Sequence, residues 1–338
     1  MIRVSIDAMG GDYAPREVVH GAVLAAREYG VSVQLVGRPQ DIENELKRHE
    51  IQGLNVSIVP ASEVVAMDEK PSKAVLRKKD SSIVKAMAQV AQGDADCVVA
   101  CGSTGAAAVA ATFIIGRLPN VMRCAIAAQM PTIHTKHCIV VDAGANVDCD
   151  AEMLVQFGLM GSILYSGLNN VKRPRVGVLN IGAEETKGND LVQQTYALLK
   201  ARDDLNFIGF VEGRDYPMGK VDVVVTDGFT GNVSLKTAEG IAKMVNHMLK
   251  QELMSSMRGK LGGVIAKPAF KALKSRVDPD IFGGAPLVGL KGVCVIAHGG
   301  SRHTAVKNAI RVACDMVRAD VVGTIEKSFR STKAEVRS

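Results

Sequence analysis

The sequence predicts an α/β protein, with a doubly wound, mostly parallel sheet and helices on both faces. Three observations support this fold class. Short runs rich in β-branched residues alternate with longer helical patterns along most of the chain. Several of these runs are continuously apolar, which is typical of strands that helices bury on both faces. Short loops rich in glycine and polar residues follow many of the runs and precede the next helix, as in βα units.

The elements alternate in chain order. Ten short apolar runs are predicted to be strands, at residues 3–6, 33–36, 56–59, 97–100, 125–129, 138–141, 176–179, 207–210, 221–226 and 293–297. Eight patterns are predicted to be helices, at about residues 15–29, 39–49, 73–92, 105–115, 151–166, 186–202, 232–258 and 302–328. No change of composition marks a linker, so we expect one domain over residues 1–330 and a polar tail at residues 331–338.

A basic amphipathic helical region is expected to project from the sheet layer at about residues 240–282. Between Lys243 and Arg276 there are eight basic residues and one acid, Glu252, with apolar residues at helical spacing. Such a segment can lie on an anionic bilayer or bind an acidic partner, or it can pack in a dimer with its basic face solvated. Residues 254–290 contain several glycines and prolines and are predicted to be irregular. The residues expected to dock a membrane or a carrier protein are Met254, Met257, Arg258, Lys260, Lys267, Lys271 and Lys274.

Composition argues against several classes of protein. Hydrophobic residues make up 47% and charged residues 22%, as in globular enzymes. Aromatic residues make up only 4% and Trp is absent, so a stacking platform for nucleic acid is not expected. No apolar run approaches about 18 residues, the length of a membrane span. The seven cysteines lack a CxxC pair and the chain opens on a strand, which together predict a cytoplasmic protein with reduced thiols.

Six polar loops follow predicted strands, at residues 7–12, 101–106, 142–146, 180–189, 227–232 and 298–301. In a parallel sheet the carboxyl ends of the strands share one edge, where helix N-termini and exposed N–H groups bind anions. We therefore expect the six loops to form one large anion-binding site.

Three side chains in these loops are candidates for chemistry. Lys187 could stabilise negative charge as it develops, although it could also be a solvated lysine in the first turn of a helix. Asn232 could donate its amide to an oxyanion, or it could cap the following helix. His298 ends the last strand and could act as an acid, a base or a phosphate donor, or be structural.

Several common motifs are missing from the chain. It contains neither G-x-x-x-x-G-K-[ST] nor G-x-G-x-x-G, so neither ATP nor a dinucleotide is predicted. It has no G-x-S-x-G elbow of an acyl-serine hydrolase. His134 and His137 have no partner pair at a metal-binding spacing, so no metal or cofactor is expected. Cys101 is predicted to be a small buried residue at a strand end rather than a nucleophile.

Taken together, the motifs resemble the acyl-acyl carrier protein:phosphate acyltransferases of bacterial phospholipid synthesis. Seven stretches carry the resemblance in the order of the family, at residues 7–15, 102–106, 142–146, 177–189, 227–232, 283–290 and 298–301. One position departs from the pattern, because Ser103 stands where the family usually has asparagine. A hydroxyl can still donate a hydrogen bond there, so activity is expected to survive.

The resemblance implies transfer of a long-chain acyl group from acyl carrier protein to inorganic phosphate. It also implies a homodimer that associates peripherally with the inner face of the cell membrane, close to a downstream membrane glycerol-3-phosphate acyltransferase. The implied fold is similar to phosphotransacetylases and isopropylmalate dehydrogenases. The rival functions are a short-chain phosphotransacetylase that uses coenzyme A, an isopropylmalate-type dehydrogenase, and a non-catalytic membrane adaptor.

Direct attack of phosphate on the thioester needs little acid help, because the leaving thiol has a pKa near about 8.5. The work of the protein is then positioning and oxyanion stabilisation. Asp7 and Asp142 are expected to brace their loops. The residues expected to be catalytic are Lys187, Asn189, Asn232 and His298. Those expected to bind phosphate or thioester are Gly10, Gly11, Gly102, Ser103, Thr104, Gly105, Asn146, Asn180, Gly228 and Ser301.

Overall fold

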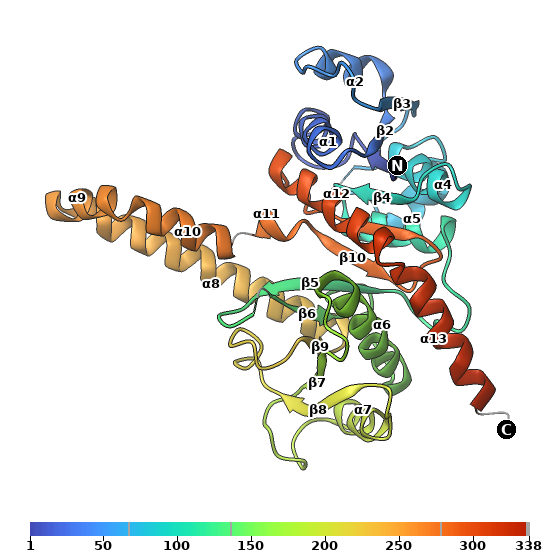
Figure 1. The fold of residues 1–338 in the computed structure, drawn as a ribbon, viewed down its shortest axis with the longest axis vertical. Helices are drawn as coiled ribbons and strands as arrows, with labels where there is room; N and C mark the ends of the chain where they lie inside the picture. The colour runs from blue at the N-terminus through green and yellow to red at the C-terminus, as the bar shows by residue number, and fades with distance from the viewer. Residues whose placement is uncertain (67, 136, 278, 336–338) are drawn as a thin grey trace.

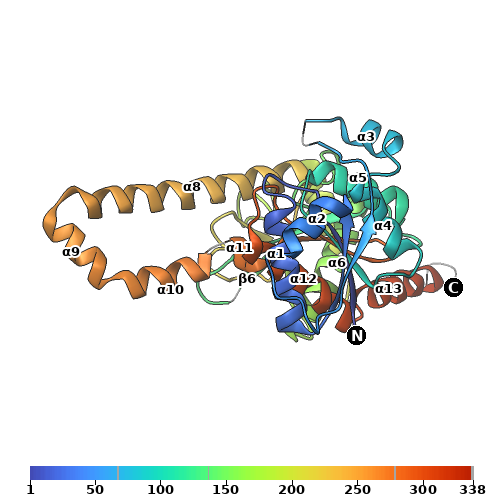
Figure 2. The same cartoon turned by 90° about the horizontal axis from the view of Figure 1, so that it is seen from above.

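An eleven-stranded sheet with helices on both faces lies at the centre of the computed structural model, which describes residues 1–338 except 67, 136, 278 and 336–338 (Figure 1). Helices α3, α4, α5 and the start of α8 lie on one face, and α1, α6, α12 and α13 on the other (Figure 2). The predicted α/β class, with a mostly parallel sheet, is confirmed. The ten predicted strands are all present, and the structure adds β10.

The strands are β1 (Arg3–Asp7), β2 (Ser32–Gly37), β3 (Val56–Pro60), β4 (Cys97–Ala100), β5 (Ala125–Pro131), β6 (His137–Val141), β7 (Arg175–Leu179), β8 (Asn206–Val211), β9 (Val223–Val225), β10 (Ala285–Val288) and β11 (Val293–Ile296). Their order across the sheet is β3-β2-β1-β4-β11-β10-β5-β6-β9-β7-β8. Strand β10 lies in the segment that was predicted to be irregular. Gly283 and Gly284 precede it and Pro286 lies within it, and these residues normally interrupt strands.

The sheet consists of two parallel blocks that run in opposite directions. Strands β3, β2, β1, β4 and β11 are mutually parallel, and so are β6, β9, β7 and β8. Between the blocks, β11 and β10, β10 and β5, and β5 and β6 pair antiparallel, so the direction reverses three times. The carboxyl ends of the two blocks therefore face opposite edges of the sheet. The expectation that all strands share one edge is wrong.

The helices are α1 (Arg16–Tyr29), α2 (Pro39–Leu46), α3 (Pro71–Arg77), α4 (Ser82–Ala91), α5 (Thr104–Ile114), α6 (Ala151–Asn169), α7 (Asp190–Lys200), α8 (Gly228–Ser255), α9 (Met257–Ile265), α10 (Lys267–Val277), α11 (Pro279–Phe282), α12 (His303–Arg318) and α13 (Val321–Glu335). Two predicted helices are each divided in two. Residues 78–81 separate α3 from α4, and a break at Asp320, whose φ is 46°, separates α12 from α13.

Helices α8, α9 and α10 form a hairpin that projects from the body of the protein (Figures 1 and 2). Helix α8 has 28 residues, which corresponds to a length of about 42 Å. The predicted projection is confirmed, but its second half is mainly helical rather than irregular. None of the helices in the described part of the chain is long and apolar enough to cross a bilayer.

Candidate functional site

Three of the predicted loops meet at the carboxyl ends of the neighbouring strands β1, β4 and β11. The backbone N–H of Asp12 donates to the carbonyl of Gly299 over 2.8 Å. Gly11 has a φ of 94°, and a methyl group there would lie 2.5 Å from the carbonyl oxygen of Cys101 and 2.8 Å from that of Gly299. The loops thus approach more closely than any side chain at residue 11 would allow. We call this group the first-edge cluster; its predicted site residues are Gly10, Gly11, Gly102, Ser103, Thr104, Gly105, His298 and Ser301.

Helix α5 begins in the first-edge cluster. Ser103 is its N-cap, and the Ser103 Oγ accepts a hydrogen bond from the N–H of Ala106 over 3.4 Å. Thr104 and Gly105, the first two helical residues, are exposed. The N–H groups of a first turn lack partners within the helix and attract anions. Asparagine and serine are comparable N-caps, so Ser103 can cap α5 as an asparagine would.

His298 is exposed, and its own loop fixes which ring nitrogen can donate. The N–H of Gly300 donates to His298 Nδ1 over 3.1 Å. In a neutral imidazole that accepts at Nδ1, the proton is on Nε2. The N–H of Ser301, which is buried, donates to the carbonyl of His298 over 2.9 Å and closes the loop. His298 thus presents Nε2–H as a donor in the first-edge cluster.

Sequence reasoning missed one cation beside this cluster. Arg302 is exposed and its guanidinium lies 4.6 Å from the centre of the Tyr13 ring, which is also exposed. Stacking on an aromatic ring holds the guanidinium in a fixed orientation and leaves its N–H groups available for an oxyanion. The two residues are far apart in sequence, so no local motif could reveal the pair.

Asp7 and Cys101 are structural parts of the first-edge cluster. Burial raises the pKa of the Asp7 carboxyl, and its Oδ1 accepts from the N–H of Met9 over 3.2 Å. A methyl group on Gly10 would lie 2.7 Å from Asp7 Oδ2, so the carboxyl fills the space under the loop. Burial also raises the pKa of the Cys101 thiol, so the thiol stays protonated and does not form the thiolate that a nucleophile requires. The prediction of a buried Cys101 is confirmed.

The other three loops follow β6, β9 and β7, which are also neighbours in the sheet. We call them the second-edge cluster; its predicted site residues are Asn146, Asn180, Lys187, Asn189, Gly228 and Asn232. Asp142 is fully buried there and accepts from the N–H groups of Ile126, over 2.8 Å, and Asn146, over 2.7 Å. Burial raises the pKa of this carboxyl. Its hydrogen bonds fix the path of the loop at residues 142–146.

Two predicted binding residues in this cluster hold loops together. Asn146 Nδ2 donates to the carbonyl of Cys124 over 2.8 Å and to Asp142 Oδ2 over 2.9 Å. Gly228 is buried, and its N–H donates to the carbonyl of Asn146 over 2.8 Å. Both therefore shape the ends of β6 and β9 instead of presenting polar groups outward.

Lys187 lies in the loop before α7 rather than in its first turn. Helix α7 begins at Asp190, and its N-cap is Asn189, whose Oδ1 accepts from the N–H of Val192 over 3.0 Å. The alternative of a solvated lysine thus holds for its exposure but not for its place in a first turn. Lys187 is exposed, and within the described part of the chain its ammonium has no hydrogen bond or ion pair. The cap engages the amide oxygen of Asn189 and not the NH2 group that would meet an oxyanion.

Asn180 supports the loop that carries Lys187. Its side chain is buried, and Nδ2 donates to the carbonyls of Gly182 over 3.0 Å and of Lys187 over 3.2 Å. Its Oδ1 accepts from the N–H of Ile181 over 2.8 Å. Asn180 is thus a positioning residue for Lys187.

Asn232 is not the cap of α8. Asp227 fills that position, because its Oδ1 accepts from the N–H of Thr230 over 2.8 Å. Asn232 lies one turn further on and is exposed. Its Nδ2 would be 3.3 Å from a methyl group on Gly144, so its amide lies against the loop that follows β6. The amide remains a candidate donor in the second-edge cluster.

The two clusters are far apart within one chain. Six strand spacings separate β4 from β7, which corresponds to about 29 Å across the sheet, and the two strands end at opposite edges. Ser103 and Lys187 of one chain therefore cannot contact the same phosphate. The prediction of one site built from six loops is wrong for a single chain, which instead has two clusters of three loops.

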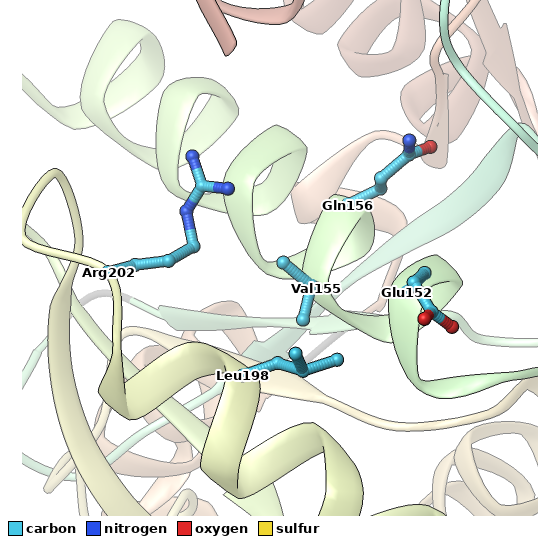
Figure 3. A pocket seen from close by; sticks show the side chains of 5 residues that line it. All are labelled: Glu152, Val155, Gln156, Leu198 and Arg202. Atoms are coloured by element: carbon cyan, nitrogen blue, oxygen red, sulfur yellow. The ribbon is translucent and has the colours of Figure 1, made fainter. Parts of the chain in front are cut away.

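A hollow of about 250 Å³ lies between α6 and α7 (Figure 3). Glu152, Val155 and Gln156 line one side of it, and Leu198 and Arg202 line the other. It contains none of the predicted site residues.

A groove of about 720 Å³ lies within the projecting hairpin, between α8 and the α9–α10 segment. Its walls are largely apolar, and among the described residues three lysines and no acid line it. The lining residues are Asn246, Leu249, Lys250, Leu253, Met254, Lys260, Gly263, Val264, Lys267, Phe270 and Leu273. Three of the predicted docking residues, Met254, Lys260 and Lys267, belong to this lining. Met257, Arg258 and Lys271 are exposed on α9 and α10, and the side chain of Lys274 lies outside the described residues.

Comparisons with known proteins agree with the motifs. A family model described as "Fatty acid synthesis protein" matches residues 2–324. A phosphate acyltransferase of Clostridium botulinum is 46% identical over 327 residues, covering 96% of this chain and 97% of the relative. A phosphate acyltransferase of Geobacter sulfurreducens is 48% identical over 320 residues, covering 95% and 92%. Among solved structures, a phosphotransacetylase from Streptococcus pyogenes has the same fold, with a TM-score of 0.64, 15% identity and 94% of each chain covered.

Proposed function

The chain belongs to the phosphate acyltransferases, enzymes of fatty acid and phospholipid synthesis, and from this premise we propose that it transfers a long-chain acyl group from acyl carrier protein to inorganic phosphate. The observation that supports this most is the first-edge cluster. It combines the N-terminus of α5, the Ser103 and Thr104 hydroxyls, and the Nε2–H of His298. All of these groups can donate hydrogen bonds, and the oxygens of a phosphate dianion can accept hydrogen bonds from several directions at once.

The proposed reaction is a direct displacement. An oxygen of hydrogen phosphate attacks the thioester carbon, the C–O bond forms, and the C–S bond breaks to release the carrier thiolate, which then takes up a proton. His298 Nε2–H donates to a phosphate oxygen and orients the nucleophile, and Arg302 balances its charge. Fixed donors of this kind lower the barrier because they are already oriented when charge moves to the carbonyl oxygen.

A homodimer would explain the exposed apolar stripe on α8 and the position of the two clusters at opposite edges of the sheet. On α8, Ile241, Met244, Val245 and Met248 form a stripe at helical spacing, with 52%, 54%, 53% and 57% of their surface exposed. A continuous apolar stripe of this kind is typical of a surface that a partner covers. A second copy of the chain is the partner we propose. Two copies related by a twofold axis can bring the first edge of one chain to the second edge of the other.

We propose accordingly that each reaction site is shared between two chains. The first-edge cluster of one chain holds phosphate, and the partner's Lys187 approaches the thioester oxygen. This arrangement gives a function to an exposed ammonium that pairs with no described residue of its own chain. It also accommodates the opposite strand directions, which keep the two clusters apart within each chain.

The tip of the hairpin is proposed to bind an anionic membrane surface. On α9, Met257, Leu261, Val264 and Ile265 are 80%, 64%, 70% and 73% exposed. Arg258 and Lys260 lie among them. An acidic carrier protein would be recognised by the basic charges alone, whereas the exposed apolar side chains favour insertion between lipid headgroups. Acyl phosphate would then be released beside the membrane, within reach of a membrane-bound acyltransferase that consumes it.

Charge reversal of Lys267 and Lys271 to glutamate is expected to release the protein from vesicles that contain anionic phospholipid. Each basic residue near such a surface contributes roughly 1 kcal/mol, so reversing two charges should lower the bound fraction strongly. Co-sedimentation at low salt measures it. Lys47→Glu with Lys172→Glu, two exposed lysines on the body of the protein, is the matched control and should stay bound. Unchanged vesicle binding by the hairpin variant, or an equal loss of binding by the control, would contradict the proposal. If the hairpin variant still bound vesicles but no longer bound acyl carrier protein, the basic face would be assigned to the carrier protein.

The function is tested by incubating the protein with palmitoyl-acyl carrier protein and radiolabelled phosphate. Labelled acyl phosphate is expected, together with free carrier thiol in equal amount. Parallel reactions contain palmitoyl-coenzyme A or acetyl-coenzyme A as donor. Product from acetyl-coenzyme A alone would identify a short-chain phosphotransacetylase. If no donor gives product, a nicotinamide absorbance assay with 2-hydroxy acids tests the dehydrogenase alternative.

A further inference from the structure

Three side chains that have no part in the proposed acyl transfer converge where α1 packs on α12. Glu17 and His20 lie one turn apart on α1, and His303 is the first residue of α12. One ligand atom from each of the three lies within 4.8 Å of the other two. The helices approach closely here, since a methyl group on Gly21 would be 2.6 Å from the carbonyl oxygen of His303. The cluster thus lies between two closely packed helices.

Hydrogen bonds and ring contacts orient the three side chains. Glu17 Oε2 accepts from the N–H of His303 over 2.9 Å and lies 2.7 Å from His303 Nδ1. The ring of His20 stacks on that of His303, with centroids 4.3 Å apart, and the ring of His49 covers its other face at 4.9 Å. Glu17 is buried, while the three histidines are half-buried and accessible to small ions.

We propose that Glu17, His20 and His303 form a binding site for a divalent transition-metal ion such as Zn²⁺. Two imidazoles and one carboxylate are a common zinc ligand set with an open fourth position, and a Glu-x-x-His pair on one helix turn is a known way to supply two of them. Because the rings of His20 and His303 are stacked, one of them would have to rotate for both to coordinate the same ion. Ligand atoms now within 4.8 Å would close to the roughly 3.3 Å that bond lengths of about 2.0–2.1 Å require.

The ion would connect α1 to α12 beside the candidate site. The loops at residues 7–12 and 298–301, which belong to the first-edge cluster, lead directly into these two helices. A bound ion would therefore stabilise the scaffold of that cluster without contacting the reacting groups. Since ligand binding to the folded state raises the melting temperature, thermal unfolding reports the site independently of acyl transfer.

The test is titration of chelator-treated, tag-free protein with Zn²⁺ by calorimetry, and with Co²⁺ by visible absorption. One equivalent is expected to bind with a Kd in the micromolar range or below, and to raise the melting temperature. His20→Ala leaves the contact between Glu17 and His303 intact and is expected to weaken binding at least about tenfold. His303→Ala should do the same if circular dichroism shows a native fold.

His134→Ala and His247→Ala, which change exposed histidines elsewhere, are the matched controls and should bind like the wild type. Absence of saturable binding by the wild type would overturn the proposal. Binding that is unchanged in His20→Ala would also overturn it, because the ion would then be held at another place. The outcome does not depend on which acyl donor the enzyme uses.

Discussion

Replacing His298 with asparagine is expected to reduce acyl-phosphate formation at least about a hundredfold, the usual cost of losing one preoriented donor. An asparagine Oδ1 can accept from the N–H of Gly300 in the place of Nδ1, so the hydrogen bond that shapes the loop is kept. What is lost is the Nε2–H donor toward phosphate. The measurement is turnover with palmitoyl-acyl carrier protein at saturating and limiting phosphate.

The neighbouring substitutions separate binding from loop structure. His298→Gln places an amide N–H near the position of Nε2 and should retain more activity than His298→Asn. His298→Ala removes both the donor and the loop contact and should be at least as impaired as His298→Asn. Because His298 is exposed, all three variants are expected to melt close to the wild type. Unchanged melting temperatures would show that the loss of activity does not come from unfolding. Turnover of His298→Asn within about threefold of the wild type would remove this donor from the mechanism.

The sequence predicted the elements well because their signals are local. Continuous apolar runs gave the position of every buried strand from β1 to β9, and the glycine-rich loops gave the strand ends. Helix starts were less certain where two capping residues compete. Asp227 caps α8 and Asn189 caps α7, so one start came earlier and the other later than predicted. Both differences change which side chains remain available for a ligand.

Strand direction could not be predicted, because it depends on pairing between distant segments. The strand that was missed, β10, carries Pro286 and is preceded by Gly283 and Gly284. Its two antiparallel pairs, with β11 and with β5, leave β5 parallel to β11. The antiparallel pair of β5 with β6 then reverses the second block. Both β5 and β6 were predicted as strands, but their relative direction is not encoded in either segment alone, and it determines that the six loops do not meet at one edge. In the same way, Glu17 and His303 are far apart in sequence, and only the packing of α1 on α12 brings them together.

Replacing Lys187 with alanine is also expected to reduce turnover at least about a hundredfold, since its ammonium is the cation proposed to stabilise the thioester oxygen. Lys187→Arg keeps the charge and should be less impaired. Lys200→Ala is the control for loop stability, because Lys200 contacts Glu185 of the same loop over 3.2 Å and is given no part in the reaction. Near-normal turnover by Lys187→Ala would exclude this lysine.

Mixed dimers decide whether the site is shared. A dimer of one Lys187→Ala chain and one His298→Asn chain, purified through two different tags, contains one site with both changes and one with neither, if each site takes Lys187 from the partner. It should recover about half the wild-type activity, although either variant alone has almost none. If Lys187 acted within its own chain, each site of the mixed dimer would carry one change and no activity would return. Ser103 follows β4 and Lys187 follows β7, and these strands lie about 29 Å apart across the sheet and end at opposite edges, so we expect the recovery.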